Sequence, residues 1–162
     1  MGKAKAAAEV VVESSVPFYL WSLLIIVVWW FAIAAVFRSL ATVKVISFDK
    51  VDKVDPRSFY AGKELAMKDT SGRVRRINAA HANTAEALVL WFGAVLLGMQ
   101  TGLDKDVLNF WAKIFIAARI LFPFVYAYAD TSKKSTLRSL VWMVGFVSTV
   151  TVLYQAIQAG AS

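Results

Sequence analysis

The sequence predicts an all-α membrane protein, a bundle of four transmembrane helices. Three observations support this fold class. The 162 residues are 59% hydrophobic, above the share of about 45–50% that is usual in soluble domains, and the mean hydropathy is +0.59. Residues 14–37 and 139–162 carry no charged side chain, and each segment exceeds the roughly 20 residues that cross a bilayer as a helix. Two further apolar segments between them complete the bundle.

The first span is expected at about residues 16–38. It belongs to a single membrane domain over residues 14–162, which follows an N-terminal tail at 1–13. The span is too long for the core of a signal peptide and no convincing cleavage site follows it, so we expect it to remain in the mature protein. The loop after it, residues 39–76, is long and charged, and the segment Val43–Phe48 within it resembles a short strand.

The second and third spans are expected at about residues 78–103 and 107–128, joined by a tight turn. Both contain charged residues, and periodicity alone does not separate them from buried helices of a soluble bundle. Because the charge-free segments on either side commit the chain to the bilayer, we interpret both as membrane helices. A short polar connection leads to the fourth span, at about residues 138–159.

The distribution of lysine and arginine predicts the orientation. The first loop, counted from Arg38 to Arg76, holds ten of these residues, whereas the tight turn holds only Lys105. By the positive-inside rule the first and third loops lie in the cytoplasm and both termini lie on the other side. The endoplasmic reticulum, a plastid membrane and the bacterial inner membrane all satisfy this topology.

The net charge of +7 is accounted for by the ends of the spans, where basic residues set topology and contact lipid headgroups. Membrane lipids are therefore expected as partners, and nucleic acid is not. The chain has no cysteine and one histidine, so no metal site is expected.

Polar side chains cluster at one depth. Residues three, four or seven apart share a helix face, so Arg76, Asn83 and Glu86 form one stripe on the second span. Arg119 and Tyr126 form another on the third. Glu86 lies ten residues inside Arg76, or about 15 Å, and Arg119 lies at a similar depth. Because a lone charge at the centre of a membrane helix costs at least about 2.5–3.5 kcal/mol, we expect Glu86 and Arg119 to form a structural ion pair.

Together with Arg38 and Arg138, these stripes predict a polar cavity that opens to the cytoplasm. Arginines outnumber carboxylates in this set, which favours an anionic ligand. Simpler interpretations stay open: Arg38 and Arg76 fit a role in topology, and the pair of charges fits a purely structural one. His81 is rotated away from the stripe and is expected to pack or hydrogen-bond between helices. Pro123 cannot donate to the carbonyl oxygen of Arg119, so it predicts a local irregularity in the third span.

The segment RINAAHANTAEAL, residues 76–88, resembles the second-span signature of the MAPEG family, the membrane-associated proteins in eicosanoid and glutathione metabolism. The matching positions are Arg76, Ala80, His81, Asn83 and Glu86. The arginine and tyrosine seven residues apart on the third span, and the Arg138–Ser139 pair that opens the fourth, are similar to the family pattern as well. The resemblance covers about residues 15–158.

This resemblance implies a homotrimer of four-helix protomers with active sites between subunits. It implies glutathione as cofactor and a lipophilic small-molecule substrate, in glutathione transferase or peroxidase activity toward lipophilic electrophiles or lipid hydroperoxides. Arg138 would be the catalytic residue that stabilises the thiolate. The family roles place the following residues around glutathione, with Arg38 reaching in from a neighbouring subunit: Arg38, Arg76, Asn83, Glu86, Tyr126 and Ser139.

Three positions favour an alternative. Several glutathione-using members carry arginine where this chain has Ala79 or Ala82, and some carry tyrosine at the position of Ala87. The alternative is a non-catalytic scaffold with the same fold, or a subunit of a larger membrane complex, which binds a lipid or pigment and docks a partner on its long loop. A transporter is less expected, because the charged residues cluster in one leaflet and no inverted repeat is visible.

Overall fold

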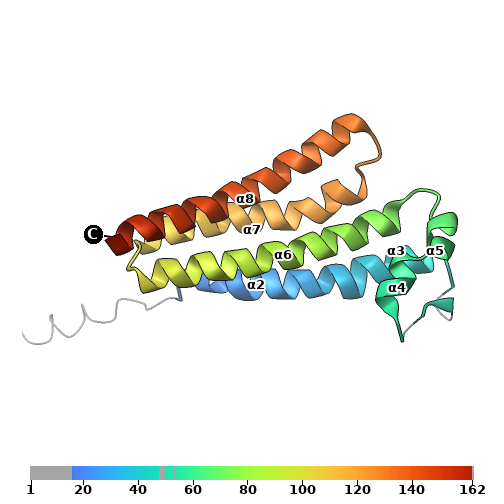
Figure 1. Ribbon diagram of the computed structural model, residues 1–162, viewed down its shortest axis with the longest axis horizontal. Helices are drawn as coiled ribbons and strands as arrows, with labels where there is room; N and C mark the ends of the chain where they lie inside the picture. Colours follow the sequence, from blue (N-terminus) through green and yellow to red (C-terminus); the bar gives the residue numbers. More distant parts are fainter. Residues whose placement is uncertain (1–15, 48–49, 53, 162) are drawn as a thin grey trace, which may run out of the picture.

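The computed structural model describes residues 16–47, 50–52 and 54–161, so the expected N-terminal tail lies outside the described residues. All regular structure in these ranges is helical. Four of the helices are long and apolar enough to cross a membrane, and they lie alongside one another in Figure 1. The predicted all-α fold class with four spans is confirmed.

The first span is longer than expected. Helix α2 (Phe18–Ala32) continues through the π-helical turn η1 (Ile33–Arg38) into α3 (Ser39–Val43). The expected strand at Val43–Phe48 is wrong for the residues described, because Val43 ends α3 and the N–H groups of Val45 and Ile46 bond back to Thr42 O at 2.9 and 2.8 Å. These bonds continue the helical turn and leave no extended segment.

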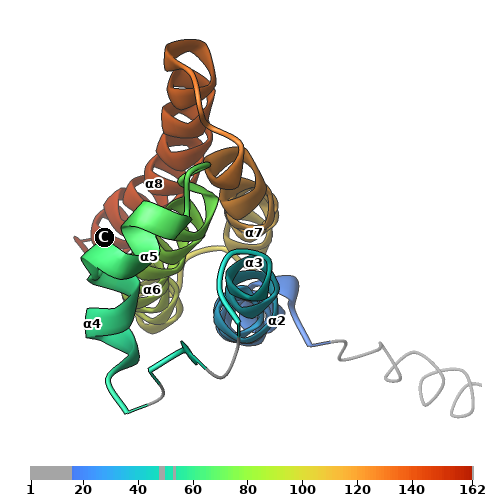
Figure 2. The same cartoon turned by 90° about the vertical axis from the view of Figure 1, so that its right-hand side faces the viewer.

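The loop folds as two short helices, α4 (Pro56–Ala61) and α5 (Lys63–Lys68). Asp55 caps α4 by accepting a hydrogen bond from Ser58 N at 3.1 Å. A small core of Ile46, Tyr60, Leu65 and Val74 holds the loop against the start of the next helix. Figure 1 shows α4 and α5 at the same end of the bundle, which we call the loop end, and this end faces the viewer in Figure 2.

Helix α6 (Arg73–Gln100) begins five residues before the expected residue 78. The buried carboxylate of Asp69 explains the early start, because it accepts hydrogen bonds from Arg75 N at 3.1 Å and from Ser71 Oγ at 3.0 Å. The bond from Arg75 N satisfies one of the donors that a helix N-terminus leaves unpaired, and the bond from Ser71 holds the carboxylate in place. Gly72, with φ of 65°, makes the turn that leads in. Arg73, Arg75 and Arg76 are therefore helical.

Helices α7 (Lys105–Ala127) and α8 (Ser132–Ala161) complete the bundle. The side chain of Asp104 caps α7 by accepting from Asp106 N and Val107 N. In Figure 1 the C-terminal half of α8 lies along α7, while its N-terminal half diverges toward the loop end. This divergence leaves room for side chains between α6, α7 and α8.

A buried core fixes the middle of the bundle. Trp91 of α6 stacks on Phe115 of α7 with ring centroids 4.2 Å apart, and its indole Nε1 donates to Ser22 Oγ of α2 at 2.9 Å. Trp29 of α2 donates to the carbonyl oxygen of Arg119 at 3.0 Å, the oxygen that Pro123 cannot serve. Three helices are thus held in one register next to the polar residues.

Candidate functional site

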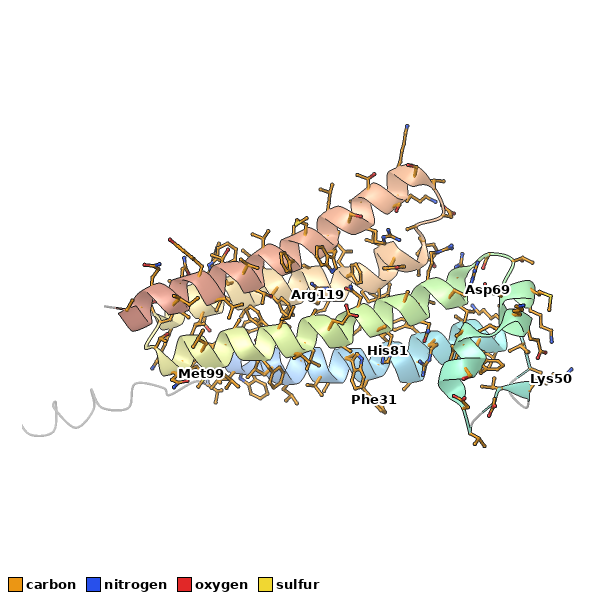
Figure 3. All side chains as sticks on the ribbon, viewed as in Figure 1. Phe31, Lys50, Asp69, His81, Met99 and Arg119 are labelled. Carbon is orange, nitrogen blue, oxygen red and sulfur yellow. The ribbon has the colours of Figure 1, made fainter. Side chains whose placement is uncertain are left out.

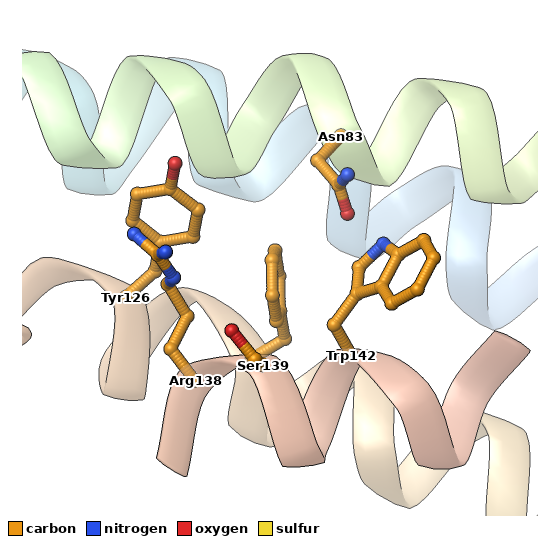
Figure 4. A pocket seen from close by; sticks show the side chains of 6 residues that line it. Asn83, Tyr126, Arg138, Ser139 and Trp142 are labelled. Carbon is orange, nitrogen blue, oxygen red and sulfur yellow. The ribbon is translucent and has the colours of Figure 1, made fainter. Parts of the chain in front are cut away.

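A cavity of about 240 Å³ lies between α6, α7 and α8, and we call it the Arg138 cavity. Figure 4 shows Asn83 of α6 facing Arg138, Ser139 and Trp142 of α8, with Tyr126 of α7 on one side. Phe122 completes the lining. The structure therefore brings together four residues that the sequence singled out: Asn83, Tyr126, Arg138 and Ser139. Sequence reasoning missed Trp142, although it lies one helical turn after Arg138 and so shares its face.

The lining of the Arg138 cavity is rich in hydrogen-bond donors and includes no carboxylate among the described residues. The Arg138 guanidinium carbon lies 4.6 Å from the centroid of the Tyr126 ring, in a cation–π contact. The ion pairs among the described residues, Lys68–Glu64 and Lys134–Asp130, do not involve it. Its charge is therefore available to an anion in the cavity.

Arg119 lies behind this cavity, in the middle of the bundle (Figure 3), and is 2% exposed. Its Nη1 donates to Asn83 Oδ1 at 3.2 Å. The rings of Phe115 and Phe122 flank the guanidinium carbon, with centroids at 5.5 and 5.6 Å. The Arg119 guanidinium is therefore stabilised by cation–π contacts with two phenylalanine rings and by one hydrogen bond to an amide oxygen.

The expected ion pair between Glu86 and Arg119 is not formed within the described residues of the chain. Both line a small cavity of about 70 Å³. The ion pairs of the described residues, which require a nitrogen–oxygen distance of 4.0 Å or less, nevertheless do not include Glu86 with Arg119. The reason is that Glu86 is exposed on the surface of α6, whereas the guanidinium extends inward to Asn83. A carboxylate at membrane depth is left facing out of the protomer.

Arg76 does not line the Arg138 cavity. Its Nε donates to the carbonyl oxygen of Ala127 at 3.0 Å and its Nη2 to that of Ser71 at 2.9 Å. Ala127 is the last residue of α7, so Arg76 joins the start of α6 to the end of α7. This arrangement supports the structural interpretation of Arg76.

Arg38 lies in a different cavity of about 520 Å³, between the end of the first span, α4 and α6, which we call the Arg38 cavity. Its Nη1 donates to Asn78 Oδ1 at 3.2 Å, and its guanidinium lies 4.4 Å from the centroid of the Tyr60 ring. No sequence signal marked Tyr60, because it belongs to the loop.

His81 also lines the Arg38 cavity and stacks on Trp30 with centroids 4.9 Å apart. As expected, it faces away from Asn83; Figure 3 shows it on the side of α6 toward α2. Three buried polar atoms of this cavity have no hydrogen-bond partner among the described residues: Trp30 Nε1, Arg38 Nε and His81 Nε2. Unpaired buried groups are uncommon in folded proteins, and these three belong to residues that line the same cavity.

In the comparison with protein families, the model of the MAPEG family matches residues 16–158. This range includes the first three spans, the fourth span except its last three residues, and the residues that line the Arg138 and Arg38 cavities. No curated protein and no solved structure gives a significant match.

Proposed function

Because the chain belongs to the MAPEG family, we propose that it is a glutathione-dependent membrane enzyme. The proposed activity is that of a glutathione transferase or peroxidase, with lipophilic electrophiles or lipid hydroperoxides as the second substrate. Members of the family generally use glutathione as substrate or cofactor.

One observation carries the proposal: the Arg138 cavity gathers Asn83, Tyr126, Arg138 and Ser139, and no carboxylate of the described part of the chain lines it. Glutathione presents two carboxylates and a thiol, so a donor-rich lining matches its charge. Ser139 Oγ donates to Ser135 O at 3.1 Å, so its oxygen can accept a hydrogen bond from an ammonium or amide group. The fit to a short anionic peptide is good in charge and in donor set.

Bound glutathione would supply the thiolate nucleophile. We assign its stabilisation to Arg138, because a cation near a thiol lowers the thiol pKa by favouring the anion. The cation–π contact with Tyr126 holds the guanidinium at the cavity without neutralising it. In conjugation with an aryl halide, a carbon–sulfur bond would form, the carbon–halogen bond would break, and halide and one proton would be released.

A homotrimer with shared sites is part of this proposal. Glu86 is exposed at membrane depth, where an unpaired charge is costly, so contact with a neighbouring protomer would relieve that cost. Arg38 lines a separate cavity, so it would reach glutathione only from a neighbouring subunit. The unpaired atoms of the Arg38 cavity support such a contact. Glu86 and Arg38 are thus retained as proposed glutathione-binding residues at a subunit interface.

The orientation is likewise proposed from the basic residues. The loop end and the α7–α8 connection would face the cytoplasm and both termini the other side, so the Arg138 cavity would open toward cytoplasmic glutathione. The lipophilic substrate would come from the bilayer, and acidic lipids would contact the loop end.

Activity in lipid vesicles tests the proposal. We expect glutathione-dependent conjugation of a generic aryl halide or glutathione-dependent reduction of a lipid hydroperoxide by the reconstituted protein. Arg138→Ala should lower the rate by at least about tenfold, which corresponds to the loss of about 1.4 kcal/mol of transition-state stabilisation. The absence of both activities, with no saturable binding of glutathione, would show that the proposal is wrong.

A non-catalytic scaffold or complex subunit is the second candidate. It is favoured by alanines at 79 and 82 and by a folded loop whose surface exposes Val54 and Met67, at 96% and 73%. Purification in mild detergent would then yield a stoichiometric larger assembly, whereas the enzyme proposal predicts a homo-oligomer alone.

A further inference from the structure

Arg119 is a buried cation that the proposed chemistry does not use. It lies one layer behind the Arg138 cavity, is 2% exposed, and has no carboxylate within ion-pair distance among the described residues. Its side-chain hydrogen bond goes to Asn83 Oδ1, at 3.2 Å, and its buried Nε has no partner in the described part of the chain. A cation this costly to bury needs a reason.

Gly145 of α8 makes the position of Arg119 possible. A Cβ atom at residue 145 would lie 2.9 Å from both Nε and Nη2 of Arg119, closer than real Cβ contacts allow. The guanidinium therefore occupies space that any other residue would take from it. By contrast, a Cβ at Gly93 of α6 would meet nothing within 4 Å, which makes Gly93 a matched control for substitution of a helical glycine.

The contact fixes the orientation of the Asn83 amide. Arginine offers only donors, so the atom of Asn83 that it contacts must be the oxygen. The Asn83 amide nitrogen then has no hydrogen-bond partner among the described residues, and it is not among their fully buried unpaired atoms. An accessible, unpaired NH₂ group lies at the wall of the Arg138 cavity.

We propose that Arg119, admitted by Gly145, is a positioning residue that holds Asn83 with its NH₂ group free to donate to the ligand. The site would then select an acceptor, a carboxylate or carbonyl oxygen of the peptide part of glutathione, at this point. This inference rests on the proposed function and deepens it. Without Arg119 the amide can rotate by half a turn and present its oxygen, which would repel the same acceptor.

The amide orientation can be tested without any ligand. The chain has three asparagines, at positions 78, 83 and 109, so ¹⁵N-asparagine labelling gives three side-chain NH₂ signals, assigned by an Asn83→Ala variant. Gly145→Ala should shift the Asn83 signals and leave those of Asn109 in place, whereas Gly93→Ala should shift none. If Gly145→Ala fails to fold, Arg119→Met replaces it, and Arg119→Lys, which keeps a charged donor, should restore part of the wild-type shift.

Glutathione titration of the same variants tests the selectivity. Gly145→Ala should weaken binding by about fivefold to fiftyfold, as expected for a lost or reversed hydrogen bond, and should raise KM more than it lowers kcat, because Arg138 is untouched. In an Asn83→Ala background the same change should have less than about a twofold effect, since the two residues act as one unit. Gly93→Ala should bind like wild type.

The outcomes separate the two claims. If the wild type binds no glutathione, the proposed function fails, and the NMR signals still decide the orientation of Asn83. If glutathione binds and Gly145→Ala matches Gly93→Ala in both the Asn83 signals and affinity, the positioning role of Arg119 is wrong. An equal loss of affinity in the Asn83→Ala background would show that Arg119 acts on structure alone.

Discussion

Pro123 removes a hydrogen-bond donor from α7, and the indole of Trp29 supplies another. The Arg119 carbonyl oxygen that loses its helical donor accepts from Trp29 Nε1 at 3.0 Å. In hydrocarbon an unsatisfied carbonyl is costly, so the indole both satisfies α7 and fixes α2 against it. The same residue, Arg119, directs its side chain to Asn83. One position therefore links the packing of the first span to the Arg138 cavity.

Trp29→Phe should lower the free energy of unfolding in detergent by about 0.6 kcal/mol, the average found for hydrogen bonds between membrane helices, and by no more than about 1.7 kcal/mol. In a Pro123→Ala background, where residue 123 can again donate to Arg119 O, the cost should shrink. Unfolding in mixed micelles measures both values. Trp21→Phe, at an exposed position of the same helix, serves as the control. An equal cost of Trp29→Phe in both backgrounds would contradict this account.

At the residue scale, the sequence showed which polar groups need a hydrogen-bond or ion-pair partner, but it did not show which residue that partner is. The free carbonyl at Arg119 follows from the position of Pro123, but its donor is 90 residues away and no local pattern points to it. The expected pair of Glu86 and Arg119 is not formed within the described chain, for a related reason. Matched depth did not reveal that Asn83, on the inward face of the same helix, would take the guanidinium while Glu86 stayed exposed.

At the scale of the elements, an ion pair lies at the start of α8. Helix α8 begins after a short connection in which the Asp130 carboxylate lies 2.7 Å from Lys134 Nζ. The hydrogen bond from Lys134 is the main cause that lowers the pKa of Asp130 below its ordinary value, with smaller contributions from the charges of Lys134 and Arg76. An ion pair between Asp130 and Lys134 therefore stabilises the turn between α7 and α8.

This contact gives a prediction for pH. Because the pKa of Asp130 is lowered in the folded protein, the contact is fully formed above the unfolded-state pKa of about 3.9 and is lost as pH falls through the lower folded value. A ¹³C NMR titration of the Asp130 carboxyl should give a midpoint below that of an unstructured aspartate, and Lys134→Ala should raise it. An unchanged midpoint in Lys134→Ala would contradict the assignment.

At the element scale the four helices were predictable and their ends were not. Long apolar segments identify spans because the bilayer demands them. The starts of α6 and α8 lie in polar sequence, where local capping decides: Asp69 extends α6 back to Arg73. Because residues 39–76 are polar and charged, we expected a loop through residue 76, and the short helices α4 and α5 within it were not predicted.

The whole molecule is a four-helix bundle in which some polar groups of the described residues have no partner within the chain. Glu86 is exposed at membrane depth, and the Arg38 cavity holds three unpaired buried atoms. The fold class and the family could be recognised from the sequence, because both depend on features of one chain. The subunit contacts that we propose for Arg38 and Glu86 involve a second chain, and no pattern within one sequence identifies them.

The absence of cysteine from the chain makes the proposed orientation easy to test. Single cysteines at Lys133 and Gln158, on opposite ends of α8, should react on opposite sides of the membrane. In sealed vesicles whose non-cytoplasmic face points outward, a thiol reagent that cannot cross the membrane should label Gln158→Cys. It should label Lys133→Cys only after permeabilisation. The reverse pattern would show that the positive-inside assignment is wrong.

Calorimetric titration of glutathione into the lipid-reconstituted protein tests the central claim most directly. It needs no knowledge of the second substrate. The account predicts saturable binding to the wild type and at least about a tenfold weaker affinity for Arg138→Ala, a loss of about 1.4 kcal/mol, with Gly93→Ala unchanged. Absence of saturable binding, or equal affinity of wild type and Arg138→Ala, would contradict it.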